Sequence, residues 1–147
     1  VLSTPGHTPD SMTFLLENVA FTGDTLFVDN VGRPDLGEDL SADAALLWES
    51  LQTLFQLSGA TIIFPAHYNP KVMVKKNIPV AISLADLQPH LPLQSKEEFI
   101  SFITGDKLSK PANVEVIVGI NRGLEFMDDA DIHELEAGPN RCAATEI

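Results

Sequence analysis

The chain has 147 residues and a formal net charge of −12, with 44% hydrophobic and 20% charged residues. This length is enough for one domain with a buried core, and the composition is that of an ordinary globular protein. The acidic balance argues against nucleic acids and anionic membrane surfaces as partners, because both are bound through basic patches. No apolar run approaches the roughly 20 residues of a membrane-spanning helix. The single cysteine, Cys142, fits a reducing compartment, so we expect a cytoplasmic protein.

Short apolar runs in the first part of the chain predict β-strands. Residues 1–3 end the first of them, and the Thr-Pro-Gly sequence of residues 4–6 forces a turn. Residues 11–16 and 19–22 predict a hairpin around a two-residue polar break. Residues 28–39 are rich in Gly, Pro, Asp and Asn, and a polar loop beside a strand end is a common carrier of function.

A helix and then a buried strand are predicted next. Ser41 suits the N-cap of the helix, and Gly59 suits its end. Residues 61–64 (TIIF) are β-branched and apolar, which predicts the strand. This order predicts an α/β fold in which the helix packs across a sheet. The helix has one apolar face, formed by Ala44, Leu47, Trp48, Leu51, Leu54 and Phe55.

The second half of the chain is less regular because prolines interrupt it. Residues 82–87 suit one or two helical turns. Residues 95–98 (SKEE) form a capping box that predicts a helix ending at Gly105. Residues 113–120 are apolar and fit either a helix or a strand, and residues 129–136 fit a short helix.

Three metal-ligating side chains follow three predicted strand ends. His7 and Asp24 each come directly after a glycine, and His67 follows the run at residues 61–64. Each alone is an ordinary loop residue, but functional groups in α/β folds gather at the carboxyl ends of strands. Imidazole and carboxylate are the usual ligands of zinc and non-haem iron. The combination therefore predicts a metal site.

Two further residues have competing interpretations. Arg33 would either form an ion pair with Asp35 that holds the loop, or bind an anionic substrate through its forked guanidinium. Tyr68, which directly follows His67, would either support a metal ligand from the outside or simply pack.

At these residues the chain resembles the C-terminal half of a metallo-β-lactamase-fold protein. Residues 4–11 (TPGHTPDS) are similar to the third histidine motif of that superfamily. Residues 21–27 (FTGDTLF) are similar to its bridging-aspartate motif, and residues 64–68 (FPAHY) to its last histidine motif. The resemblance implies that residues 1–147 form half of an αββα sandwich, with a mixed sheet and helices on one face.

Within the superfamily, residues 31–36 (VGRPDL) resemble the persulfide dioxygenase branch. This resemblance implies a mononuclear Fe(II) site held by two histidines and one aspartate, with His7 and Asp24 as two of the ligands. His67 would lie beside the iron, and Arg33 would lie near the substrate. That substrate would be a thiol persulfide of glutathione or a similar carrier, which is oxidised to sulfite.

The His-x-His-x-Asp-His motif of the family is absent from this sequence. Since this motif belongs to the N-terminal half of the family domain, we expect that half to be missing here, together with the third iron ligand. The intact protein is then predicted to be the enzyme, and this chain an inactive fragment with an incomplete site.

Two alternatives remain open. In a dizinc thioester hydrolase of the glyoxalase II type, His67 and Asp24 would both bind Zn²⁺, and a bound hydroxide would be the nucleophile. In a non-catalytic half domain, the chain would cover its apolar faces by binding a partner or by self-association as a homo-oligomer.

Overall fold

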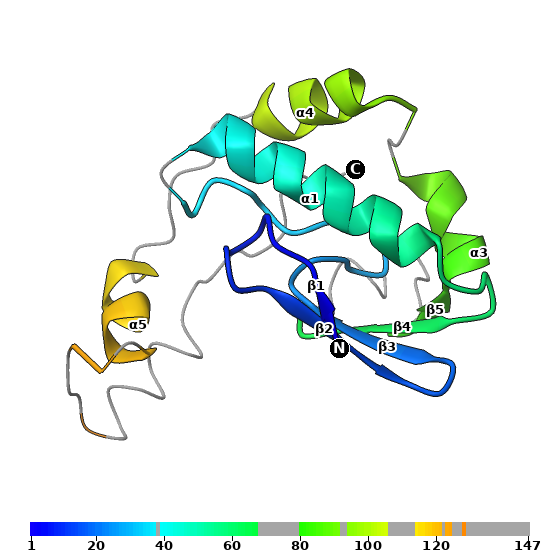
Figure 1. Ribbon diagram of the computed structural model, residues 1–147, viewed down its shortest axis with the longest axis horizontal. Coiled ribbons are helices and arrows are strands. Elements are labelled where there is room, and N and C mark those ends of the chain that lie inside the picture. Colours follow the sequence, from blue (N-terminus) through cyan, green and yellow to red (C-terminus); the bar gives the residue numbers. More distant parts are fainter. Residues whose placement is uncertain are drawn as a thin grey trace. The chain divides into compact units, whose positions relative to one another are not determined.

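The computed structural model describes residues 1–37, 39–67, 80–91, 94–105, 114–121, 123–124 and 128. Its centre is a five-stranded mixed sheet with the strand order β1-β2-β3-β4-β5 (Figure 1). The strands are β1 (Leu2–Ser3), β2 (Met12–Leu16), β3 (Val19–Gly23), β4 (Ile62–Pro65) and β5 (Ile82–Ser83). The hairpin predicted from residues 11–16 and 19–22 is confirmed as β2 and β3, and its turn places Glu17 at a positive φ of 53°.

The strand directions bring three chain segments to one edge of the sheet. β3 and β4 run parallel and are joined through the helix α1 (Leu40–Phe55), as the order of the sequence elements predicts. β1 and β3 both pair antiparallel with β2, so they point the same way. The carboxyl ends of β1, β3 and β4 therefore lie at the same edge.

The ends of α1 differ from the prediction. Its N-cap is Asp39, whose carboxylate accepts hydrogen bonds from the backbone N–H groups of Ser41 and Ala42. Ser41 is therefore inside the first turn and not the cap, because the aspartate two residues earlier already satisfies the free N–H groups. The helix also ends at Phe55, before Gly59, since Gln56 caps it in a right-handed conformation. A Cβ atom on Gly59 would lie 3.2 Å from the Ala85 Cβ, so this glycine allows close packing.

The other described helices are α3 (Leu84–Leu87), α4 (Lys96–Gly105) and α5 (Val114–Asn121), with a 3₁₀ turn at Gln88–His90. The helix predicted to end at Gly105 is confirmed as α4, and Ser95 is its N-cap, because the Glu98 N–H donates to the Ser95 hydroxyl at 3.1 Å. Residues 82–87 are helical only from Leu84 onward. The segment that fitted either a helix or a strand forms α5, which belongs to a second compact unit at residues 108–141. The helix predicted at residues 129–136 lies outside the described residues.

The core lies between the sheet and the helices on one of its faces. α1 covers this face, and α4 packs along α1 (Figure 1). The buried cluster joins the sheet to α1, α3 and α4, and its members include Ala20, Ile63, Leu47, Leu51, Leu54, Leu84, Leu87, Phe99 and Ile103. The predicted fold class, an α/β arrangement with a mixed sheet and helices on one face, is thus confirmed.

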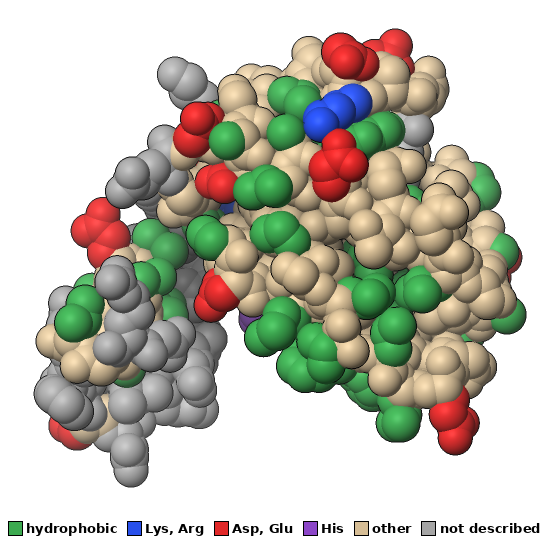
Figure 2. Space-filling view, in the orientation of Figure 1, with side chains coloured by type: hydrophobic (Ala, Val, Ile, Leu, Met, Phe, Trp, Pro, Cys, Tyr) green, Lys and Arg blue, Asp and Glu red, His purple; other side chains and the backbone are tan. Residues whose placement is uncertain are grey.

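The opposite face of the sheet is apolar and exposed. Successive strand residues point to alternate faces, and the buried Thr13, Ala20 and Ile63 alternate with exposed large side chains. Figure 2 shows hydrophobic side chains gathered on the underside of this view, where Figure 1 has the strands. Cross-strand pairing aligns three of them in a row, which we call the phenylalanine row: Phe14 (52% exposed), Phe21 (45%) and Phe64 (41%).

In the part of the chain that the structure describes, no helix combines the length and the apolar character that crossing a membrane requires.

Candidate metal centre

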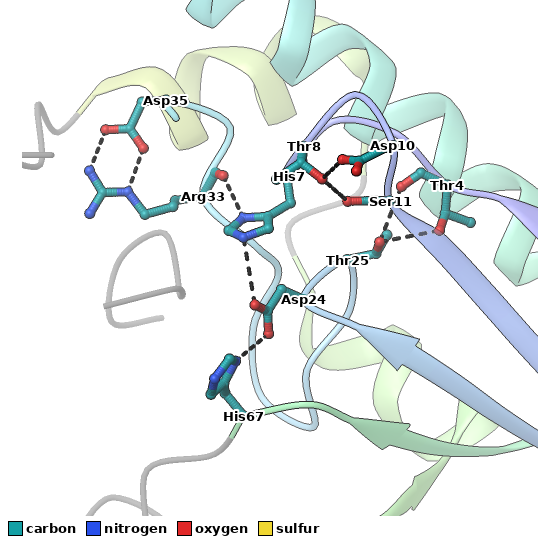
Figure 3. Close-up of polar contacts among 10 residues, drawn as sticks. All are labelled: Thr4, His7, Thr8, Asp10, Ser11, Asp24, Thr25, Arg33, Asp35 and His67. Carbon is teal, nitrogen blue, oxygen red and sulfur yellow. Dashed lines mark hydrogen bonds and ion pairs between the residues drawn. The ribbon is translucent and has the colours of Figure 1, made fainter. Parts of the chain in front are cut away.

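Three loops at one edge of the sheet carry the candidate ligands (Figure 3). His7 follows β1, Asp24 follows β3 and His67 follows β4. The backbone N–H of Ala66 donates to the Gly23 carbonyl at 3.0 Å, which holds the last two loops side by side. The structure thus brings together the three side chains that the sequence singled out.

His7 is buried and has its two ring nitrogens in different surroundings. Its Nδ1 lies 2.9 Å from the Arg33 carbonyl oxygen. Because a carbonyl only accepts, Nδ1 carries the proton, and Nε2 of the neutral ring presents a lone pair. Burial lowers the pKa of His7 below its ordinary value, although the charge of Asp24 opposes this shift, so the neutral ring is favoured.

Asp24 lies between the two histidines. Its Oδ2 is 3.6 Å from His7 Nε2, and its Oδ1 is 2.5 Å from His67 Nδ1. An ionised carboxylate only accepts, so His67 donates this hydrogen bond from Nδ1. The side chain of Asp24 is 17% exposed and that of His67 is 60% exposed, so the site opens to solvent on the His67 side.

Arg33 contributes to the site through its backbone. Its guanidinium turns away from His7 and binds Asp35 in a bidentate pair, with Nε and Nη2 each 2.6 Å from a carboxylate oxygen (Figure 3). The ion pair that was one of the two alternatives for Arg33 is therefore present. The Arg33 side chain is 2% exposed, so this pair fixes the loop whose carbonyl holds His7.

Gly32 allows this loop to approach the ligands. A Cβ atom at this position would lie 1.9 Å from the Asp24 carbonyl oxygen and 3.0 Å from the His7 Cβ. Any side chain would therefore push the 31–33 segment away from both residues. Sequence reasoning assigned no role to Gly32 or to the Arg33 carbonyl, since backbone contacts between loops leave no residue-type signal.

The donor set fits part of a metal site. The lone pair of His7 Nε2 and the carboxylate of Asp24 face each other across 3.6 Å, and two such groups are stabilised by a cation between them. The His67 Nδ1 donates a hydrogen bond to Asp24, so Asp24 contacts both histidines, and the three side chains lie in a row rather than around a common centre. Over the described ranges, no three His, Cys, Asp or Glu side chains form a group that would hold a metal ion. Tyr68 lies outside the described residues.

Comparisons with known proteins show which proteins this chain is similar to. Residues 1–67 match the Metallo-beta-lactamase superfamily. The chain is 34% identical over 122 residues to the mitochondrial persulfide dioxygenase ETHE1 of Mus musculus, covering 81% of this chain and 45% of that protein. It is 40% identical over 67 residues to the hydroxyacylglutathione hydrolase of Shewanella loihica, covering 46% of this chain and 24% of that protein.

Among solved structures, ETHE1 from Myxococcus xanthus superposes with a TM-score of 0.70 at 34% identity, over 82% of this chain and 51% of that one. The chain therefore spans about half the length of these two ETHE1 proteins. The five-stranded sheet with its strand-end ligand loops, the match over residues 1–67 and the solved structure together show that the chain has a metallo-beta-lactamase-like fold.

Proposed function

We propose that the intact protein is an Fe(II)-dependent persulfide dioxygenase that oxidises a thiol persulfide, of glutathione or a similar carrier, to sulfite. In this reaction the S–S bond breaks, the thiol is released, and O₂ and water supply the three oxygens of sulfite. The observation that carries the proposal is the donor pair of His7 Nε2 and Asp24 Oδ2, held with the lone pair of His7 toward the carboxylate. The likeness to enzymes named persulfide dioxygenases supports this substrate and its oxygenation. The resemblance of residues 31–36 to that branch of the superfamily implies the iron.

Each residue of the site has a distinct task in this proposal. His7 and Asp24 would hold the iron, which would supply redox chemistry when bound. His67 donates to Asp24 and fixes the orientation of that carboxylate, as groups surrounding metal ligands commonly do. Arg33 holds His7 through its carbonyl, and its guanidinium, bound to Asp35, keeps this loop in place beside the proposed substrate position. Tyr68 is assigned to the surroundings of the metal from its place beside His67.

We further propose that residues 1–147 are the C-terminal part of a larger metallo-β-lactamase-like domain, whose other part supplies the third iron ligand. Two observations support this. The chain spans about half the length of the persulfide dioxygenases to which it is similar. The phenylalanine row also leaves one face of the sheet uncovered, as expected of a sheet that packs against another layer.

Metal loading and oxygen uptake test this function. The 147-residue chain and a longer product containing a His-x-His-x-Asp-His motif are each loaded with Fe(II) under anaerobic conditions and then given glutathione persulfide. We expect the longer product to hold one iron per chain and to consume O₂ with release of sulfite. The 147-residue chain should bind iron weakly and show no turnover.

Two substitutions link the activity to the site. Asp24→Asn removes the carboxylate charge at the donor pair, and we expect it to abolish tight iron binding in the longer product. Asp10→Asn is the matched control, since Asp10 lies in the His7 loop but its exposed carboxylate accepts from the Thr8 hydroxyl and does not face Asp24. Equal iron content in the Asp24→Asn variant would contradict the proposed ligand role, and turnover by the 147-residue chain alone would contradict its assignment as a fragment.

The contact between His67 and Asp24 supports a second candidate, a dizinc thioester hydrolase of the glyoxalase II type. In that enzyme both side chains would bind zinc, and the metal would supply Lewis-acid activation of water. The relative named hydroxyacylglutathione hydrolase fits this chemistry, though it matches a smaller part of the chain. Two zinc ions per chain and hydrolysis of an acyl-glutathione, with no O₂ uptake, would favour it.

The proposed partner is therefore a small thiol-derived molecule. For the compartment, the single cysteine favours reducing surroundings, and the cytoplasm remains our proposal, whereas the relative from Mus musculus is named as mitochondrial.

A further inference from the structure

A buried set of threonine hydroxyls lies directly behind the candidate ligands. Thr25 follows Asp24, and its hydroxyl donates toward both the Thr4 carbonyl (3.1 Å) and the Thr4 hydroxyl (3.2 Å) (Figure 3). The Thr4 hydroxyl in turn lies 3.1 Å from that of Thr13 on β2. All three threonines are fully buried. The residue after one candidate ligand is thereby tied to the loop that carries the other.

A second buried hydroxyl binds the next carbonyl of the same loop. Ser50 of α1 is 3% exposed and donates to the Pro5 carbonyl at 2.7 Å. Gly6 follows with a φ of +132°, and a Cβ atom there would lie 2.4 Å from the Leu47 backbone. The loop is thus pressed against α1, and two consecutive carbonyls just before His7 each accept from a buried side-chain hydroxyl.

Thr25 also contacts the loop that carries Arg33. Its carbonyl accepts from the Gly32 N–H at 3.3 Å, and the neighbouring Arg33 carbonyl accepts from His7 Nδ1. Thr25 therefore contacts the His7 loop through its side chain and the Arg33 loop through its backbone.

We propose that Thr25 and Ser50 are positioning residues, which fix the His7 loop so that His7 Nε2 stays opposed to Asp24. The part of this proposal that concerns metal binding rests on the proposed function. The part that concerns the position of the His7 loop does not depend on it. Hydrogen bonds from buried hydroxyls to loop carbonyls are directional, and loss of one leaves a buried acceptor without its partner. The loop would then relax and the donor pair would separate.

The test compares variants of the 147-residue chain that keep or remove each hydroxyl. Thr25→Val removes the hydroxyl and keeps the branched shape, whereas Thr25→Ser keeps the hydroxyl. Ser50→Ala is the second test variant, because alanine favours the helix and should not unfold α1. Thr53→Val is the matched control, since the Thr53 hydroxyl binds Glu49 within α1 and does not reach the loop.

Two readouts separate positioning from general stability. The NMR signal of the His7 Nδ1 proton reports the hydrogen bond to Arg33 and needs no metal. Titration with Co²⁺, followed by its visible spectrum, reports the donor pair. We expect Thr25→Val and Ser50→Ala to weaken or remove the proton signal and to bind Co²⁺ about tenfold more weakly, the range found when outer partners of metal ligands are removed. Thr25→Ser and Thr53→Val should match the wild type in both.

The outcomes distinguish this proposal from the function on which it rests. If the wild-type 147-residue chain binds no Co²⁺, the two ligands alone do not hold a metal, and the proton signal alone decides the positioning role. An unchanged proton signal and Co²⁺ spectrum in both Thr25→Val and Ser50→Ala would overturn that role. Equal losses in Thr25→Ser and Thr25→Val would also overturn it, because the hydroxyl would then not be the cause. If Thr25→Val does not fold, Ser50→Ala decides.

Discussion

The lowered pKa of His7 follows from the surroundings of its ring. The ring is buried, one nitrogen donates to the Arg33 carbonyl, and the other faces Asp24. Burial disfavours the charged imidazolium and lowers the pKa, whereas the Asp24 charge acts in the opposite direction. Burial is the larger of these two influences, so the folded chain binds a proton at His7 less readily than the unfolded chain does.

This difference predicts a pH dependence of stability. The contribution of a group with a lowered pKa is complete above its unfolded value of 6.5 and is lost as the pH falls from there toward the folded value. We expect the free energy of unfolding of the metal-free chain to decrease as the pH is lowered from about 7.5 to about 5.5. His7→Gln should flatten this decrease, because glutamine does not titrate. Urea unfolding at several pH values measures both.

Two comparisons make the pH experiment specific. Asp24→Asn removes the charge that raises the pKa of His7, so it should steepen the loss of stability below pH 6.5. His90→Gln, at an exposed position after α3, should leave the slope as in the wild type. A slope that His7→Gln does not change would show that the buried ring is not its source.

At the scale of the elements, the N-cap of α1 is Asp39 in the structure, whereas the sequence predicted Ser41. Asp39 accepts from the N–H groups of two first-turn residues, whereas Ser41 is exposed inside the helix. We expect Asp39→Ala to lower the free energy of unfolding by about 1 kcal/mol, the usual cost of losing an N-cap. Ser41→Ala should change it by less than about 0.5 kcal/mol, and Asp39→Asn should retain most of the stability. Chemical denaturation at neutral pH measures all three, and equal costs at positions 39 and 41 would contradict the assignment.

The sequence predicted those elements whose signals are local and periodic. The apolar face of α1, the helix start at Ser95 and the β-branched run of β4 each carry such a signal, and all three are confirmed. β5 was not predicted, because two residues are too few to show a period, and its pairing with β4 depends on long-range contact. Gly59 was misassigned as a helix end, since the same residue type also permits close packing.

The candidate site was predictable to a similar degree. Residue type and strand-end position selected His7, Asp24 and His67, which do lie together. The parts that orient them are carbonyls and hydroxyls, namely those of Arg33, Thr25 and others in the same loops. Such groups occur throughout any chain, so their roles appear only when the loops are placed in space.

At the scale of the whole molecule, the two faces of the sheet are unequal. One is buried under α1, and the other exposes the phenylalanine row across β2, β3 and β4. Phe21 and Phe64 stack with ring centroids 6.0 Å apart, so they form one continuous apolar surface. Single monomers rarely expose large contiguous apolar patches. The proposed larger domain would cover this face, and without that covering layer a second copy is the nearest substitute.

We therefore expect the 147-residue chain on its own to self-associate through the phenylalanine row. Sedimentation velocity across a range of concentrations should show growing assemblies for the wild type. The double variant Phe21→Thr/Phe64→Thr keeps β-favouring side chains but removes the apolar surface, so it should remain monomeric and folded. Phe102→Gln, which removes an exposed phenylalanine from α4, should associate as the wild type does. A longer product with the covering layer should stay monomeric in the same range. A wild-type chain that is folded and monomeric at every concentration would contradict both the self-association and the need of this face for a covering layer.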